Sequence, residues 1–205
     1  MNDILLTVFA LSLLAAATPG PLTTLIISET LKHGKWAGIK IGIAPFLTDF
    51  PIMLASIFVL SKLEKLNILL GVISLFGASY LAYLAFGNIR TKSISLDSTS
   101  GSKSLMKGVI ANFLNPNPYI FYFSILGPLI VKGMKINFWL APLSVFLFLG
   151  VFILLNIIVS LSVHSAKQFF SSKEYVYVIR ILGFILLFFA FTFFKDSLQF
   201  FGIVK

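Results

Sequence analysis

The sequence predicts an all-α integral membrane protein with six transmembrane helices, arranged as two inverted three-helix repeats in which the first and fourth helices are broken. Two observations support this fold class. Apolar residues make up 58% of the 205 residues and charged residues only 11%, whereas about a quarter of the residues of a soluble domain are charged. Three pairs of prolines also share a spacing of 97 residues, namely Pro19 with Pro116, Pro21 with Pro118 and Pro45 with Pro142. Three matched pairs are hard to obtain by chance, so we interpret the chain as a duplication.

Six apolar segments have about the 17–25 residues that a helix needs to cross a bilayer. They are Ile4–Ile27, Ile39–Leu60, Ile68–Ile89, Val109–Val131, Phe138–Val163 and Tyr175–Phe194. The first polar gap is Ser28–Lys40. We predict a first repeat at residues 1–95 and a second at 108–205, joined by a serine-rich polar linker at 96–107. Three spans per repeat require the second repeat to enter the membrane in the opposite orientation.

The first segment has a short apolar run followed by small residues, as a signal peptide does. Asn2 and Asp3 stand where a signal peptide carries basic residues, however, and apolar residues resume at Leu22. We therefore expect an uncleaved and broken first span.

The two predicted breaks are Thr18-Pro19-Gly20-Pro21 and Asn115-Pro116-Asn117-Pro118. Two prolines in four residues should interrupt a helix, because each removes a backbone donor and clashes with the preceding turn. In hydrocarbon, such a break is tolerated where the backbone lines a cavity or is buried in protein. Paired breaks at matching positions of two halves indicate the binding site of a transporter. Kinks that serve helix packing alone are the alternative.

A half-helix that starts after Pro21 or Pro118 would direct N–H groups and a positive dipole end at a ligand. A carboxylate suits such a position. Asn112, Asn115 and Asn117 could offer amide groups to a polar substrate, or they could cap the broken helix ends. We take all eight residues of the two breaks, together with Asn112, as candidates for substrate binding.

Asp49 is the single acidic residue well inside a predicted span. Carboxylates inside a membrane are costly and usually mark ion or proton pathways. We predict that Asp49 pairs with the ammonium group of the substrate. We also predict that Asp49 exchanges the coupling proton. The alternative is a structural Asp49, hydrogen-bonded to Thr48 or to a helix terminus.

The basic residues predict the orientation and argue against nucleic acid as a partner. They are spread singly through the gaps, as in cytoplasmic loops, although the net charge is +9. The polar gaps that follow the first, third and fifth spans, which lie on one side of the membrane, hold ten basic residues. The opposite side holds six. The excess predicts that both termini lie outside. A lipid bilayer and a small-molecule substrate are the expected partners, and a homo-oligomer is compatible with the sequence.

Several chemistries have no support in the sequence. There is no cysteine, which excludes disulfides and thiolate metal sites, and the two histidines form no metal-binding pattern. No nucleophile–base arrangement, P-loop or carboxylate pair is present. We expect no enzyme activity, no metal site and no cofactor.

The motifs resemble those of LysE/RhtB-type amino-acid exporters. The resemblance rests on the first break, His33-Gly34, Gly38 and Asp49, then on the segment Gly77–Leu84, and finally on Lys107-Gly108 through Pro116. It covers nearly the whole chain. It implies six hydrophobic segments and export of amino acids from the cell, by antiport with protons.

Three functions follow from these observations. The first is a secondary exporter of small amino acids or related zwitterions in the cell membrane. The second is a carrier of a metal cation or another small ion on the same scaffold, although such carriers usually need several intramembrane carboxylates. The third is a membrane protein without transport activity.

Overall fold

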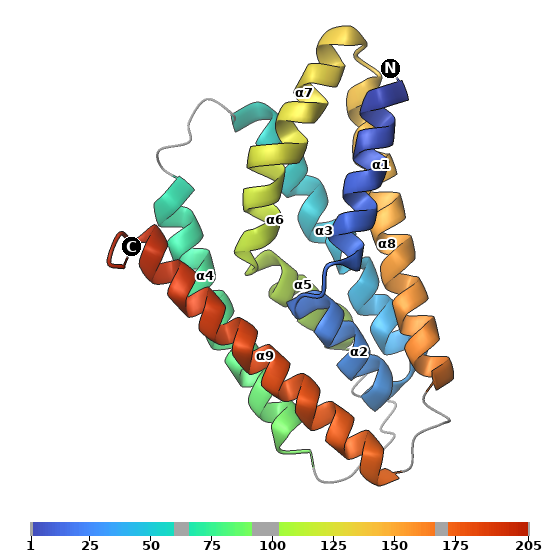
Figure 1. The fold of residues 1–205 in the computed structure, drawn as a ribbon, viewed down its shortest axis with the longest axis vertical. Helices are drawn as coiled ribbons and strands as arrows, with labels where there is room; N and C mark the ends of the chain where they lie inside the picture. Colours follow the sequence, from blue (N-terminus) through green and yellow to red (C-terminus); the bar gives the residue numbers. More distant parts are fainter. Residues whose placement is uncertain (1, 60–65, 92–102, 167–171, 205) are drawn as a thin grey trace.

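The computed structural model describes residues 2–59, 66–91, 103–166 and 172–204, and within these ranges the chain is helical with no strand. The elements are α1 (Asn2–Ala17), α2 (Pro21–His33), α3 (Lys35–Val59), α4 (Leu66–Ile89), α5 (Ser104–Phe113), α6 (Pro116–Phe121), the π-helical turn η3 (Tyr122–Leu126), α7 (Gly127–Ile136), α8 (Leu140–Ala166) and α9 (Ser172–Phe200). Figure 1 shows their arrangement.

The helices confirm an all-α membrane protein. Five stretches are long and apolar enough to cross a bilayer: Lys35–Ile57, Asn67–Ile89, Pro116–Ile136, Leu140–Ala166 and Val176–Phe200. α1 and α2 together pass the same test and are bent by 56° at the first break, which brings the number of spans to six if the pair counts as one. The fourth span begins later than predicted, at Pro116, because the residues before the second break form the separate short helix α5.

The predicted polar gap Ser28–Lys40 is wrong, because all of it except Gly34 is helical. Ser28, Glu29 and Thr30 are buried there and find partners on other helices. Ser28 accepts a hydrogen bond from the Asn88 amide, and Thr30 shares one with Ser160 at 3.0 Å. Gly34, with φ of +86°, makes the tight turn that ends α2. Of the predicted linker at 96–107, residues 104–107 form the first turn of α5 and 96–102 lie outside the described residues.

The prolines act differently according to their position. Pro21 and Pro116 each occupy the first turn of a new helix, where a missing N–H costs nothing. Pro45 and Pro51 lie inside α3, which runs through them without a break. The two breaks are therefore where the sequence places them, whereas the third matched pair, Pro45 with Pro142, interrupts neither α3 nor α8.

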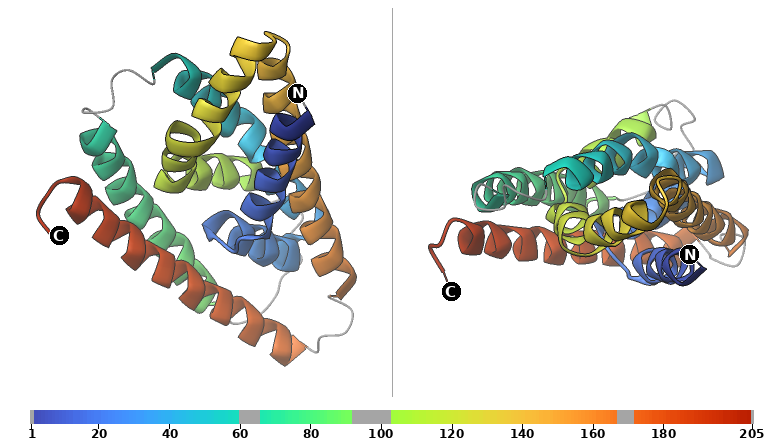
Figure 2. Two further views of the ribbon diagram at one scale, coloured as in Figure 1. Left: turned by 45° about the horizontal axis from the view of Figure 1, so that its top comes forward. Right: turned by 90° about the horizontal axis from the view of Figure 1, so that it is seen from above.

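The helices pack in pairs that match across the two halves of the chain. α4 lies along α9 on one side of the molecule, and α1 lies along α8 on the other (Figures 1 and 2). α3 packs against both α5 and α8. An offset of 97 residues relates α1 to α5 and α3 to α8, so the α1–α8 and α3–α5 contacts correspond to one another. An inverted repeat would produce this correspondence, and the repeat itself stays a prediction.

Glycines allow these helices to approach closely. A Cβ at Gly38 would collide with the side chains of Thr30 and Ser160, and one at Gly42 would lie 3.2 Å from the Asn156 Cβ. Gly77 of α4 faces the second break in the same way. A Cβ there would collide with the Leu114 carbonyl oxygen and approach the Phe193 ring to 3.0 Å.

We expect Gly77→Ala to destabilise the protein, because a backbone oxygen cannot rotate away from the added methyl group. Overpacking of this kind costs about 1–3 kcal/mol. The thermal unfolding midpoint in detergent is the measurement. Gly150→Ala is the matched control, since a Cβ at Gly150, also within a spanning helix, meets nothing within 4 Å. Equal midpoints for the two variants would show that α4 does not need to touch the second break.

Candidate functional site

A cavity of about 420 Å³ lies between the two breaks. Nine of the ten candidate residues line it, and they come from four elements or their ends: Thr18, Pro19, Gly20, Pro21, Asp49, Asn112, Asn115, Asn117 and Pro118. Pro116 is not among the lining residues; it is buried at the start of α6. The geometry therefore brings the breaks and the intramembrane carboxylate together, while their role in binding stays a prediction.

The first break leaves backbone donors at the cavity. Gly20, in an extended conformation, is the N-cap of α2 and provides no side-chain cap. The N–H groups of a first helical turn have no partner within the helix. Leu22 and Thr23, which follow Pro21 in this turn, both line the cavity. The N-terminus of α2 is therefore an uncapped positive helix end that faces the cavity.

The second break satisfies its own backbone. Pro116 and Pro118 have no N–H, and the N–H of Asn117 donates to the Asn115 side-chain oxygen at 3.0 Å. Asn115 is thus the N-cap of α6. Helix capping was the alternative to substrate binding that we gave for the asparagines. Symmetric in sequence, the two breaks differ in chemistry: the first presents main-chain donors and the second presents asparagine side chains.

Asp49 is buried in the middle of α3 with 1% of its surface exposed. Its oxygens accept hydrogen bonds from the Tyr122 hydroxyl at 2.7 Å, the Asn112 amide at 2.5 Å and the Thr48 hydroxyl at 3.2 Å. All three donors are neutral. No basic side chain of the described residues lies within 4.0 Å of the carboxylate. The Thr48 contact is the one that a structural role predicts, but Asn112 and Tyr122 also connect the carboxylate to both sides of the second break.

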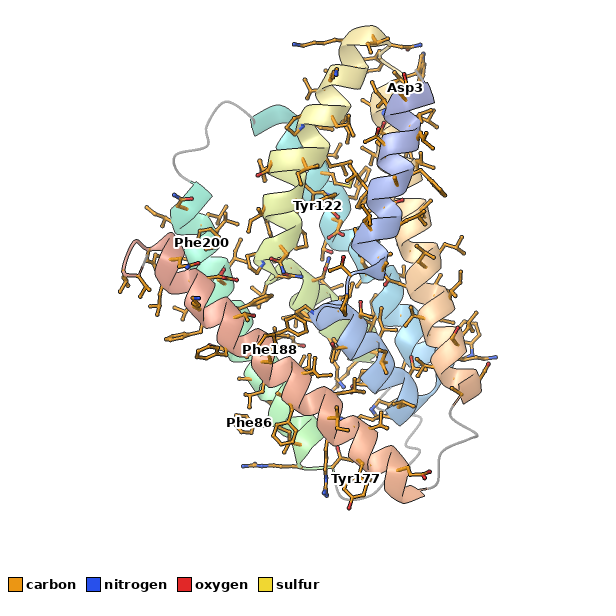
Figure 3. All side chains as sticks on the ribbon, viewed as in Figure 1. Asp3, Phe86, Tyr122, Tyr177, Phe188 and Phe200 are labelled. Carbon is orange, nitrogen blue, oxygen red and sulfur yellow. The ribbon has the colours of Figure 1, made fainter. Side chains whose placement is uncertain are left out.

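Tyr122 and an aromatic wall were not predicted. Tyr122 is the first residue of η3 and lies in the interior of the bundle (Figure 3). Its position four residues after Pro118, one turn into the helix that follows the break, was a usable signal. Phe121, Phe148, Phe152 and Phe189 also line the cavity. Nothing in the sequence distinguishes these four from the other phenylalanines, of which the chain has 23 in total.

Three members of the aromatic wall, Phe121, Phe148 and Phe152, pack together with Tyr122. The Phe148 ring lies 5.6 Å from Phe121, 5.7 Å from Tyr122 and 5.9 Å from Phe152, centroid to centroid. Offset and edge-to-face contacts at these distances are favourable. This part of the cavity lining is therefore apolar.

The described residues hold no group of three or more histidine, aspartate or glutamate side chains that could bind a metal ion. Within the cavity lining that the structure describes, Asp49 is the one carboxylate, and lysine, arginine and histidine are absent. The arrangement can bind a ligand through hydrogen bonds, one ion pair and apolar contact.

Comparison with known proteins identifies the family. The model of the family described as LysE type translocator matches residues 13–197. No curated protein and no solved structure matches the chain. Since the match includes both breaks, Asp49 and most of the chain, the protein belongs to the LysE type translocator family and is a multi-pass membrane transport protein.

Proposed function

We propose that this translocator is a secondary exporter of zwitterionic amino acids with apolar side chains, driven by exchange with protons across the cell membrane. The observation that carries the proposal is that two helix breaks and one buried carboxylate line the same cavity. Each part of an amino acid has a chemically suited position there.

The carboxylate of the substrate belongs at the first break. An anion is stabilised by the N–H groups and the positive end of a helix N-terminus. Leu22 and Thr23 supply such groups at the start of α2, whereas the N–H of Asn117 already donates to Asn115. Asn115 and Asn117 are left to bind the substrate through their side-chain amides.

The ammonium group of the substrate belongs at Asp49. An ionised carboxylate with only neutral partners is unfavourable in a low-dielectric interior unless it is protonated, paired or wetted. Asp49 has three neutral donors and no basic partner in the described structure. In an exchange cycle, Asp49 would hold a proton in one state of the carrier and the ammonium group of the substrate in the other. The cavity is poorly suited to binding a metal cation, because a single carboxylate lines it.

The side chain of the substrate belongs against the aromatic wall of Phe121, Phe148, Phe152 and Phe189. A cavity of about 420 Å³ is within the roughly 300–1,000 Å³ of small-ligand sites and leaves room for a branched or aromatic side chain. A charged side chain would lie there without a counter-ion, which is costly.

Counterflow in proteoliposomes tests the substrate class. We expect exchange of labelled leucine and phenylalanine, and rates lower by about tenfold or more for lysine and glutamate, because burying an unpaired charge costs several kcal/mol. Empty liposomes are the control. Fast exchange of lysine, or of none of the four amino acids, would contradict the assignment.

Asp49→Asn tests the coupling. The substitution keeps the shape of the side chain and removes its charge, so the protein should insert and remain monodisperse while uptake driven by a pH gradient is lost. Asp196→Asn, the same change near the end of α9 and outside the cavity, should transport normally. If Asp49→Asn transports with unchanged pH dependence, Asp49 is structural and coupling lies elsewhere.

Crosslinking tests whether the breaks border one substrate cavity in the membrane. Because the natural chain has no cysteine, Gly20→Cys with Asn117→Cys gives a unique pair. A short bifunctional reagent should join the pair, and bound leucine should slow the reaction. Gly20→Cys with Gly150→Cys, which does not line the cavity, is the control and should not crosslink. Failure of the first pair would reject the shared cavity.

We also infer that residues 1–95 and 108–205 form inverted repeats and that both termini face the outside. The matching α1–α8 and α3–α5 contacts support the repeat, and the excess of basic residues in the odd gaps supports the orientation. A reporter fused after Lys205 that functions only in the cytoplasm should therefore stay inactive. The same reporter placed in the polar segment between α4 and α5 is the control and should be active. Activity at Lys205 would reverse the orientation.

A further inference from the structure

A second polar cavity, of about 320 Å³, lies where α2 and α4 end and α5 begins. It shares no lining residue with the substrate cavity. Three basic side chains line it, Lys32, Arg90 and Lys107, against one acidic side chain, Glu29. The lining therefore carries two more positive than negative charges.

Glu29 is fully engaged and neutralises only one of these cations. With 3% of its side chain exposed, it forms an ion pair in which the Lys107 ammonium donates to its two oxygens at 2.8 and 2.9 Å. The Ser104 hydroxyl donates to the same carboxylate at 3.2 Å. This pair joins α2 to α5 and forms one wall of the cavity.

Lys32 and Arg90 remain without a carboxylate within 4.0 Å in the part of the chain that the structure describes. The Lys32 ammonium donates to the Asn88 side-chain oxygen, and the Asn88 amide in turn donates to Ser28 at 2.8 Å. A neutral acceptor thus fixes the ammonium without cancelling its charge. The Arg90 guanidinium lies 5.9 Å from the centre of the Phe86 ring, which leaves its donors available.

The α4 wall of the cavity is exposed at the surface of a predicted membrane-spanning helix. Tyr83, Phe86, Gly87 and Arg90 follow one another at helical spacing, and Tyr83 and Phe86 are 73% and 51% exposed. A Cβ at Gly87 would meet nothing within 4 Å, so the space beside the stripe is open at this point. Phe86 lies toward the lower end of α4 in Figure 3, near the end of the span at Ile89. Aromatic and basic side chains at the end of a span are typical of headgroup depth.

We propose that this cavity is a binding site for a phosphate-bearing anion, held by Lys32 and Arg90 and reached over Gly87 from the lipid. Basic pockets between transmembrane helices bind the headgroups of anionic lipids. The phosphate comes either from such a headgroup or from free phosphate in solution. The site is separate from substrate recognition and does not depend on the identity of the cargo.

Lipid retention tests the headgroup source. The full-length protein is reconstituted in nanodiscs with phosphatidylglycerol and phosphatidylcholine in equal amounts, and the lipids that remain bound after extraction are counted by native mass spectrometry. We expect retained phosphatidylglycerol, lowered roughly tenfold or more in Lys32→Gln/Arg90→Gln, because each phosphate-facing cation contributes to binding. Lys132→Gln/Lys135→Gln, which removes two charges in α7, is the matched control and should retain the lipid.

Two further arms separate the sources. Gly87→Leu keeps the charges and fills the open space on the lipid-facing side, so it should reduce lipid retention while the protein folds normally. Inorganic phosphate should raise the thermal midpoint in neutral detergent if the anion comes from solution, and this rise should vanish in Lys32→Gln/Arg90→Gln but persist in Gly87→Leu. Absence of both lipid retention and a phosphate-dependent midpoint in the wild type, or equal loss in the Lys132→Gln/Lys135→Gln control, would overturn the proposal.

Discussion

A backbone interrupted inside hydrocarbon must satisfy its N–H and carbonyl groups within the protein, and this requirement shapes the centre of the molecule. The second break meets it locally: two prolines remove donors, and Asn115 accepts from the Asn117 N–H. The first break has no such cap and directs the start of α2 at the cavity. The neighbouring helices are held around both breaks by close contacts, among them Gly77 against the Leu114 carbonyl oxygen. The cavity is thus the place where unsatisfied main-chain donors are kept away from lipid.

The charged groups that line the two cavities lie at two levels. Glu29, Lys107, Lys32 and Arg90 gather where α2 and α4 end, and Glu29 has a partner of opposite charge there. Asp49, at the level of the breaks, has neutral donors alone. Asp49 is thus the one carboxylate in the described lining of the substrate cavity, whereas the described lining of the second cavity has an excess of positive charge. Three hydrogen bonds satisfy the oxygens of this carboxylate, but none of them comes from a charged donor.

Much of the centre could be predicted from the sequence, because prolines and a lone aspartate act through local chemistry. Pro21 and Pro116 begin new helices inside the two predicted breaks, and Asp49 lines the cavity. The helical continuation through Ser28–Lys40 could not be predicted, since Ser28 and Glu29 are satisfied by Asn88 and Lys107, 60 and 78 residues away. The aromatic wall could not be selected either, because lipid-facing and cavity-facing phenylalanines have the same local pattern. Pro45 and Pro51 show the reverse. Proline tends to interrupt a helix, yet α3 continues through both of these residues within the bundle.

The cavity also has a handedness. Its uncapped helix end, its single carboxylate and its phenylalanine wall are three unlike surfaces, contributed by α2, by α3 and mainly by α6 and α8. An α-amino acid attaches its carboxylate, ammonium and side chain to one carbon, and its mirror image exchanges two of these groups. If each group occupies its own surface, only one enantiomer can engage all three at once. Two chemically identical breaks would have removed this distinction, because a pseudo-symmetric cavity accepts a ligand in two opposite orientations. The unequal capping of the two breaks is therefore what would make such a carrier stereoselective.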